Sequence, residues 1–377
     1  MKKILNTSLM SVHEPEMSLL QNFGQLGIQR KSPKNRFPLL KLPKVVLLEC
    51  IENLDVLEII LLTLLSKRAK TIAKLIRWNP LDIRLTTDSR PQIELGTPIN
   101  PCNRWFIKYD KKQESSRNLY FLSRQLGPEV FRSLLLKLDG NVIEEFKKMV
   151  EHICEVLRSP ISDIRISDKS LIDWIINFQP TIRYVSIDDK VITTSEKLNH
   201  VLKNLKVTEY FRLGSIPSYT TFEYTKPIPS RSIIINDASW LSLLAILDGN
   251  NSIIRLIGSK LTPTDINTIL KEWQMGTKLQ NLEYLEFTTA TLLDSDQWRR
   301  RVFNDLNRTE GDENHGRPTT VKIHDEYTYT LPWAHLVGNL IRGDGTIGTI
   351  GMYEEWKHDK MNLRQLRFYL QVWSRQA

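Results

Sequence analysis

The sequence predicts an α/β protein in which a small three-helix module precedes a longer, irregular α/β domain. Two observations lead to this fold class. Between residues 37 and 80, apolar residues recur at spacings of three and four, which is the period of an amphipathic helix. From about residue 141, helical patterns and short apolar strand patterns alternate, as they do in α/β proteins. Ahead of both, residues 1–36 show no clear periodicity and hold six basic against two acidic side chains, so we interpret them as a flexible basic arm.

The three-helix module spans residues 37–80, and each helix has a recognisable start. Leu42-Pro43 opens the first helix, because proline suits the first helical position. Asp55 is expected to cap the second helix and Ser66 the third, since their short polar side chains accept hydrogen bonds from the free N–H groups there. The third helix should end near Asn79-Pro80, because a residue before proline avoids helical backbone angles.

Residues 81–140 form a mixed connecting region. Leu81–Leu85 and Trp105–Tyr109 alternate between apolar and polar residues, which is typical of strands. Asn118–Leu126 and Pro128–Leu138 have more helical patterns, and we predict helices there.

Residues 141–377 form the last region, and it begins with a coarse repeat in which a helical pattern is followed by a strand pattern. Five such units suggest an irregular leucine-rich-repeat-like solenoid, whose units must stack to bury their apolar faces. A doubly wound α/β sheet with the same element order is the alternative. The helix-and-strand pairs are Val142–Leu157 with Ile161–Ile166, Leu171–Asn177 with Ile182–Ile187, Leu198–Leu205 with Val207–Leu213, Trp240–Leu247 with Ser252–Ile257, and Pro263–Trp273 with Leu282–Phe287.

The last part of this region is predicted to contain one helix and several strands. Ser295–Leu306 has a helical pattern, and Arg308–Pro318 is a polar loop. Gly343-Asp344-Gly345 is a turn signal between two strand-like segments and therefore predicts a hairpin. The strands expected here are Thr319–Ile323, Thr346–Met352 and Phe368–Trp373.

Composition and charge argue against several classes of function. The formal net charge is +9, but the basic residues are spread along the chain, whereas nucleic-acid binders usually gather them on one face. The longest apolar run, Val56–Leu65, contains Glu58 and is far shorter than the roughly 20 residues that cross a bilayer. We therefore expect neither nucleic acid nor membrane as a partner.

Cofactor and catalytic motifs are also missing from the sequence. Cys50, Cys102 and Cys154 lie far apart, so they form no zinc or redox motif and fit reduced thiols in the cytoplasm, the nucleus or both. Residues 343–348 match GxGxxG, but no helix pattern follows, so a plain turn is the better interpretation. We expect no cofactor, no metal and no enzymatic activity.

Residues 37–68 closely resemble an F-box. The resemblance rests on the opening Phe37-Pro38-Leu39-Leu40-Lys41-Leu42-Pro43 and on the ending Leu64-Leu65-Ser66-Lys67-Arg68. The C-terminal part resembles the type 2 F-box-associated domain of F-box families that are expanded in nematodes. That second likeness is carried by Ser239-Trp240-Leu241, Ile254-Arg255-Leu256, Leu270-Lys271-Glu272-Trp273 and Leu282-Glu283-Tyr284-Leu285.

The resemblance implies a role in protein ubiquitination. An F-box docks on the Skp-type adaptor of an SCF (Skp–cullin–F-box) ubiquitin ligase and, through that adaptor, on a cullin. The C-terminal domain would then capture a target protein that the sequence does not identify. A protein-binding scaffold without ligase association is the alternative.

The residue pattern agrees with an interface in the module, because three short helices have too few sides to bury all of its apolar residues. Leu54 and Ile72 are expected in its internal core, while packing of the other apolar residues against the C-terminal domain is the structural alternative. Lys67 and Arg68 are candidates for contact with an acidic partner, or else belong to a solvated helix face. The apolar residues that we expect to contact the adaptor are Phe37, Pro38, Leu39, Leu42, Pro43, Val46, Leu47, Ile60 and Leu64.

Overall fold

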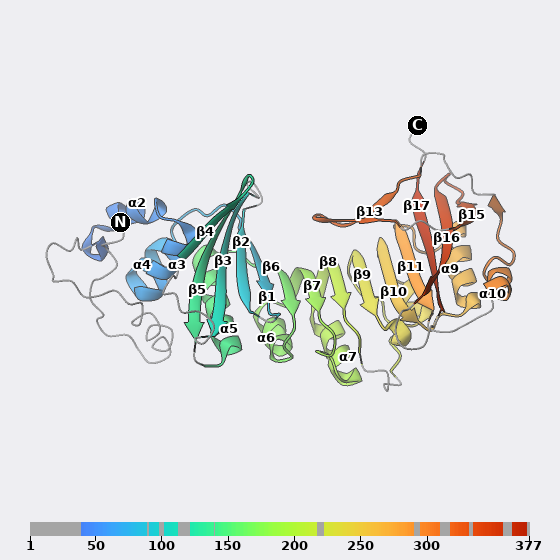
Figure 1. Ribbon diagram of the computed structural model, residues 1–377, viewed down its shortest axis with the longest axis horizontal. Helices are drawn as coiled ribbons and strands as arrows, with labels where there is room; N and C mark the ends of the chain where they lie inside the picture. Colours follow the sequence, from blue (N-terminus) through green and yellow to red (C-terminus); the bar gives the residue numbers. More distant parts are fainter. Residues whose placement is uncertain are drawn as a thin grey trace. The chain divides into compact units, whose positions relative to one another are not determined.

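The computed structural model divides the chain into two compact units, Met1–Ile164 and Arg165–Ala377. Figure 1 shows the helices and strands of each unit. We describe each unit by itself. The structure describes residues 39–88, 90–97, 102–111, 121–138, 140–216, 222–289, 295–309, 317–331, 335–356 and 364–374.

The first unit begins with the predicted three-helix module. It contains the short 3-10 helix η2 (Leu39–Lys41) and the helices α2 (Lys44–Glu52), α3 (Val56–Leu65) and α4 (Lys67–Ala73). The Asp55 side chain caps α3 and the Ser66 side chain caps α4, as predicted. The third helix ends at Ala73, earlier than expected, because the chain tightens there into bonds between residues three apart, such as Ile76 N–H to the carbonyl of Ala73.

A mainly antiparallel sheet follows the module. Its strands are β1 (Asp82–Thr86), β2 (Gln92–Gly96), β3 (Asn103–Lys111), β4 (Phe121–Leu126), β5 (Glu129–Leu138) and β6 (Ile161–Ile166), whose last two residues belong to the second unit. The strand order is β4-β5-β3-β2-β1-β6, and β3 runs parallel to β5. Helix α5 (Val142–Leu157) connects β5 to β6 and begins at the Asn141 cap.

The prediction of helices at Asn118–Leu126 and Pro128–Leu138 was wrong. The described residues there form β4 and β5, an antiparallel hairpin that turns at Gly127, whose φ is +59°. The strands β4 and β5 pair with each other, and β5 also pairs with β3, 27 positions earlier in the chain. Because β4 is mostly exposed, its sequence carries little of the alternation that marks a strand.

The second unit begins with parallel strands that alternate with helices. The elements are α6 (Ser170–Phe178), β7 (Thr181–Ile187), α7 (Ser195–Asn204), β8 (Lys206–Leu213), β9 (Ser232–Asn236), η3 (Ala238–Trp240), α8 (Leu243–Leu247), β10 (Ile253–Ser259), α9 (Pro263–Met275) and β11 (Tyr284–Thr289). Each strand from β7 to β10 pairs in parallel with the next strand of the chain, up to β11. Strand β9 was not predicted from the sequence, and its Ser-Ile-Ile-Ile-Asn run is buried at four of its five residues.

Antiparallel strands complete this sheet beyond β11. They are β17 (Arg364–Trp373), β16 (Ile347–Trp356), β15 (His335–Ile341) and β12 (Arg308–Thr309), in that order, and α10 (Ser295–Val302) precedes them in the chain. The predicted hairpin is confirmed, since β15 pairs with β16 across the turn at residues 342–346. The GxGxxG match, residues 343–348, therefore covers the hairpin turn and the start of β16.

A separate two-stranded hairpin, β13 (Thr320–His324) with β14 (Tyr327–Thr330), lies on one face of the second unit's sheet. Figure 1 shows α6 and α7 on the opposite face from this hairpin. Apolar side chains are buried on both faces. On the hairpin face, Val321 and Ile323 of β13 pack in one cluster with Ile253 and Tyr284 of the sheet. On the face away from the hairpin, Phe287 stacks on Phe368 and Trp298 packs against Phe368. Trp240, Trp273 and Leu285 are buried.

Among the helices that the structure describes, none is long and apolar enough to cross a membrane.

Candidate protein-binding surfaces

The F-box module is anchored to the rest of the first unit by polar contacts of helices α3 and α4. The Thr63 hydroxyl lies 2.8 Å from Nε2 of His152 on α5. Lys70 and Lys74 of α4 both form ion pairs with Glu155 on α5, at 2.8 Å for Lys70. The side of the module formed by α3 and α4 therefore packs against α5 of the same unit.

Asp55 joins the module to the sheet as well. Its carboxylate caps α3 by accepting a hydrogen bond from the Leu57 N–H at 3.0 Å. It also accepts one from the indole N–H of Trp105 on β3 at 3.0 Å and forms an ion pair with Arg132 on β5. A single carboxylate thus connects the start of a module helix to two strands.

The contact between α4 and α5 shifts the pKa of two titratable groups. Burial, with a smaller contribution from the nearby charge of Lys70, lowers the pKa of His152 to about 4. Hydrogen bonds from Lys70 and Lys74 lower the pKa of Glu155 to about 2. Near neutral pH, His152 is consequently neutral and Glu155 is charged.

The predicted adaptor-contact residues fall into four groups. Pro43, Val46, Lys67 and Arg68 are exposed, and Leu39, Leu42 and Leu64 are half-buried. Leu47 and Ile60 are fully buried in the module, each with no exposed surface, so neither offers surface for direct contact. Phe37 and Pro38 lie outside the described residues. Of the two residues expected in the module core, Ile72 is buried and Leu54 is half-buried.

Arg68 also has a structural role. Its guanidinium donates a 2.7 Å hydrogen bond to the carbonyl of Leu42, so it ties the start of α4 to the segment before α2. Its position thereby fixes the Leu42-Pro43 segment that the sequence analysis singled out.

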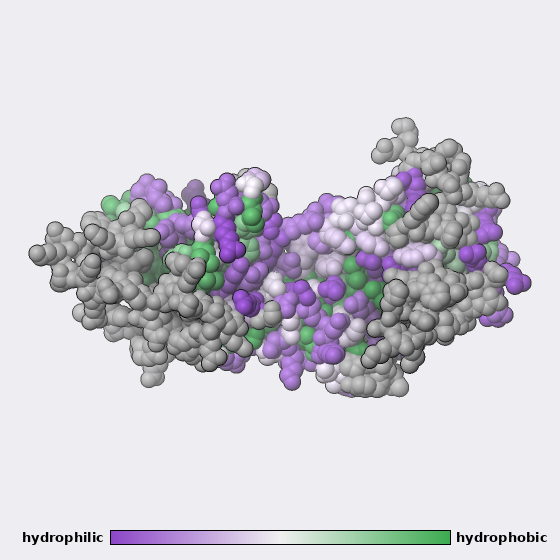
Figure 2. Space-filling view, viewed as in Figure 1, coloured by the Kyte–Doolittle hydropathy of each residue, from purple (hydrophilic) through white to green (hydrophobic). Residues whose placement is uncertain are grey.

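The start of α2 exposes apolar side chains that the sequence analysis only partly identified. Val45 is 78% exposed and Val46 is 47% exposed. Figure 2 shows hydrophobic surface where Figure 1 places α2. Leu65 and Leu75, at 36% and 41%, are further exposed apolar residues of the module that were not among the expected contact residues. Consecutive valines at positions 45 and 46 were the available signal, since one helix face cannot bury two neighbours.

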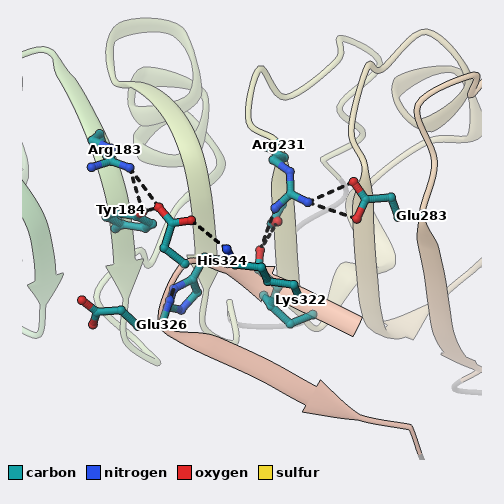
Figure 3. Close-up of polar contacts among 10 residues, drawn as sticks. Arg183, Tyr184, Arg231, Glu283, Lys322, His324 and Glu326 are labelled. Atoms are coloured by element: carbon teal, nitrogen blue, oxygen red, sulfur yellow. Dashed lines mark hydrogen bonds and ion pairs between the residues drawn. The ribbon is translucent and has the colours of Figure 1, made fainter. Parts of the chain in front are cut away.

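In the second unit, the β13–β14 hairpin is fixed to the sheet by a set of polar contacts (Figure 3). The Asp325 carboxylate at its tip accepts hydrogen bonds from Arg183 and Tyr184 of β7, at 3.2 and 3.0 Å. The Ile323 carbonyl accepts a hydrogen bond from the Ser232 hydroxyl at 2.6 Å. Figure 2 shows mostly pale surface, of intermediate hydropathy, at the place of this hairpin.

The comparisons with known proteins identify both regions. A family model described as F-box domain matches residues 39–79, and one described as F-box associated matches residues 227–287. Neither the curated proteins nor the solved structures gave a match. The chain therefore contains an F-box domain and an F-box-associated domain. Together these two domains indicate a non-catalytic, adaptor-type protein.

Proposed function

We propose that this protein is the substrate-recognition subunit of an SCF-type ubiquitin ligase. Its F-box binds a Skp-type adaptor, which in turn binds a cullin, and its C-terminal domain binds a target protein. The observation that carries the proposal is the apolar start of α2, Val45 and Val46, which stays exposed on an F-box domain whose other side packs on its own unit. Exposed apolar side chains of this kind usually mark a binding surface.

The surrounding residues suit such an interface. Leu39 and Leu42 are half-buried near the two valines in the sequence, while Lys67 and Arg68 add exposed positive charge. In protein interfaces, a few apolar anchors surrounded by polar and charged residues carry most of the binding free energy. We assign the anchor role to Val45 and Val46, with Leu42 and Pro43 beside them.

The test is co-purification of the full-length protein with a Skp-type adaptor. In the double variant Val45→Asp and Val46→Asp, two apolar contacts worth about 1.5 kcal/mol each would be lost, so affinity should fall roughly 100-fold. A matched control places aspartate at two leucines elsewhere that are more than half exposed, Leu126→Asp and Leu244→Asp. The control should keep the adaptor.

Two results would contradict the proposal. Equal loss of the adaptor in both double variants would mean that exposed aspartates act non-specifically. Absence of adaptor binding by the unchanged protein would favour the alternative, a protein-binding scaffold outside the ligase.

We also propose that the parallel part of the second unit is leucine-rich-repeat-like. Its support is the strand order from β7 to β11, in which every strand lies beside the next one of the chain without reversal. A doubly wound sheet would reverse its strand order at a switch point.

For localisation, we propose the cytoplasm, the nucleus or both. This proposal is supported by Cys50, Cys102 and Cys154, which are thiols outside any disulfide bond, as is typical of reducing compartments.

A further inference from the structure

The hairpin face of the second unit's sheet carries a row of in-register residues that includes two arginines. Arg212 of β8 pairs with Ile234 of β9, Ile234 with Arg255 of β10, and Arg255 with Glu286 of β11. Tyr210 contacts His324 of the hairpin, and side chains two apart share a face of a strand. Arg212 therefore points to the same side as the hairpin.

Carboxylates of the chain itself already bind this face at several arginines. Arg183 binds Asp325 at 3.2 Å, and Arg231 binds Glu283 at 2.9 Å (Figure 3). Glu286, which is almost completely buried, binds Arg255 at 2.9 Å and Arg367 at 3.3 Å. The face thus presents arginines in a geometry that carboxylates can occupy.

Arg212 differs from these arginines. Within the described part of the chain, it forms no ion pair or hydrogen bond through its side chain, although it is half-buried. Arg255 also has N–H donors that are not hydrogen-bonded within the described residues. Its Nε bonds to Glu286 and its guanidinium lies 4.1 Å from the ring centre of Tyr329, while its other N–H donors have no partner among the described residues. Glu286 forms ion pairs with both Arg255 and Arg367, so one carboxylate serves two arginines. Arg212, three strands from Glu286, adds another positive charge to the row.

Strand β14 borders this row, and its edge away from β13 pairs with no strand that the structure describes. Strand β13 lies over the start of β9, where Ile323 binds Ser232, whereas Tyr329 of β14 lies over Arg255. In the described residues, β13 is the one strand that pairs with β14. Tyr327 of β14 is 42% exposed. An extended peptide can add to such an edge through its backbone, and its alternate side chains then point to one side.

We propose that an acidic, extended segment of the target protein binds along β14 and places carboxylates on Arg212 and Arg255. This inference rests on the proposed function, because it names the class of ligand that the C-terminal domain would take. Carboxylates fit because Asp325 and Glu283 occupy neighbouring arginines of the same face. A peptide fits better than a nucleic acid because only a peptide backbone can pair with a strand edge.

The experiment measures binding of labelled decapeptides to the full-length protein by fluorescence anisotropy at low salt. One peptide alternates glutamate with threonine, and its counterpart alternates lysine with threonine. The protein should bind the glutamate peptide and not the lysine peptide. Arg212→Glu should weaken binding of the glutamate peptide about tenfold, the effect of losing about 1.4 kcal/mol of charge-assisted contact.

Controls separate this inference from misfolding and from the adaptor role. Arg299→Glu reverses an exposed arginine on α10 and should change peptide affinity less than twofold. Arg212→Gln removes the charge without reversing it and should give a smaller loss, with an unchanged circular dichroism spectrum. Co-purification of the Arg212→Glu variant with the adaptor tests adaptor binding by the F-box on its own. A loss of peptide binding can therefore be told apart from a loss of adaptor binding.

Three results would overturn the inference. The first is equal binding of the two peptides, and the second is an equal effect of Arg212→Glu and Arg299→Glu. The third is tighter, Arg212-dependent binding of a labelled deca-thymidine oligonucleotide, which would assign the face to nucleic acid.

Discussion

Replacing Asp55 by alanine should loosen the F-box from the sheet of its own unit. The carboxylate makes three contacts at once: the cap of α3, the hydrogen bond from Trp105 and the ion pair with Arg132. Alanine removes all three and leaves the indole N–H of Trp105, a residue that is 8% exposed, without this partner. The module should therefore open from the sheet more often.

The magnitude follows from the three contacts. Loss of an N-cap costs about 1 kcal/mol. Loss of a hydrogen bond between a charged acceptor and a buried donor costs about 1.5–3 kcal/mol. The Arg132 side chain is 46% exposed, so its ion pair contributes at most about 1 kcal/mol. Because contacts of one group are not additive, we expect a total of about 3 kcal/mol.

The assay is native-state hydrogen exchange of the amides in α2, α3 and α4. If the module opens as a unit, 3 kcal/mol corresponds to a roughly 100-fold loss of protection. Asp82→Ala is the matched control, because the Asp82 carboxylate makes one long contact, 3.5 Å, to a partly exposed Arg84. Unchanged protection in Asp55→Ala, or equal loss in both variants, would refute the reasoning that this carboxylate holds the module in place.

Two further predictions concern pH and packing. Because the pKa of His152 falls from 6.5 to about 4 on folding, its contribution to stability is complete above pH 6.5 and decreases by up to about 3 kcal/mol as the pH falls to 4. Urea unfolding at several pH values should show this decrease, and His152→Gln should flatten it. An equal slope in that variant would contradict the assignment. In the second unit, a Cβ at Gly348 would lie 2.7 Å from Trp273, which is fully buried. Gly348→Ala should therefore destabilise the protein by about 1–3 kcal/mol in thermal unfolding. Gly343→Ala, in the same hairpin with nothing within 4 Å, should have almost no effect, and equal melting temperatures in the two variants would disprove the packing argument.

Most of the elements could be predicted from the sequence because their signals are local. The caps at Asp55 and Ser66 need only the side chain and the next three residues. The helix α5 and the strand β7 follow from apolar spacing within one turn or one strand, and the turn at residues 343–345 follows from its glycines. The same locality explains the F-box resemblance, since the motif is a run of residues that are close in sequence.

Other elements depend on partners that are distant in the chain. The hairpin β4–β5 had a helical pattern, yet β5 becomes a strand because β3 pairs with it. Strand β9 lies in a long segment between β8 and η3 and is defined by pairing on both sides. No local period could indicate either pairing.

The candidate binding surfaces also depend partly on local sequence patterns and partly on long-range packing. The sequence alone determined that residues 37–80 hold more apolar side chains than three helices can bury, and that caps and turns begin and end the helices where they do. Only the tertiary structure decided which of those side chains are free. Leu47 and Ile60 are buried, while Val45 and Val46 remain exposed at the start of α2. Likewise, Arg212 and Arg255 are 43 positions apart in the sequence, and sheet pairing through Ile234 places them in one row. Burial and long-range pairing depend on the whole packed chain, and a local pattern therefore cannot determine them.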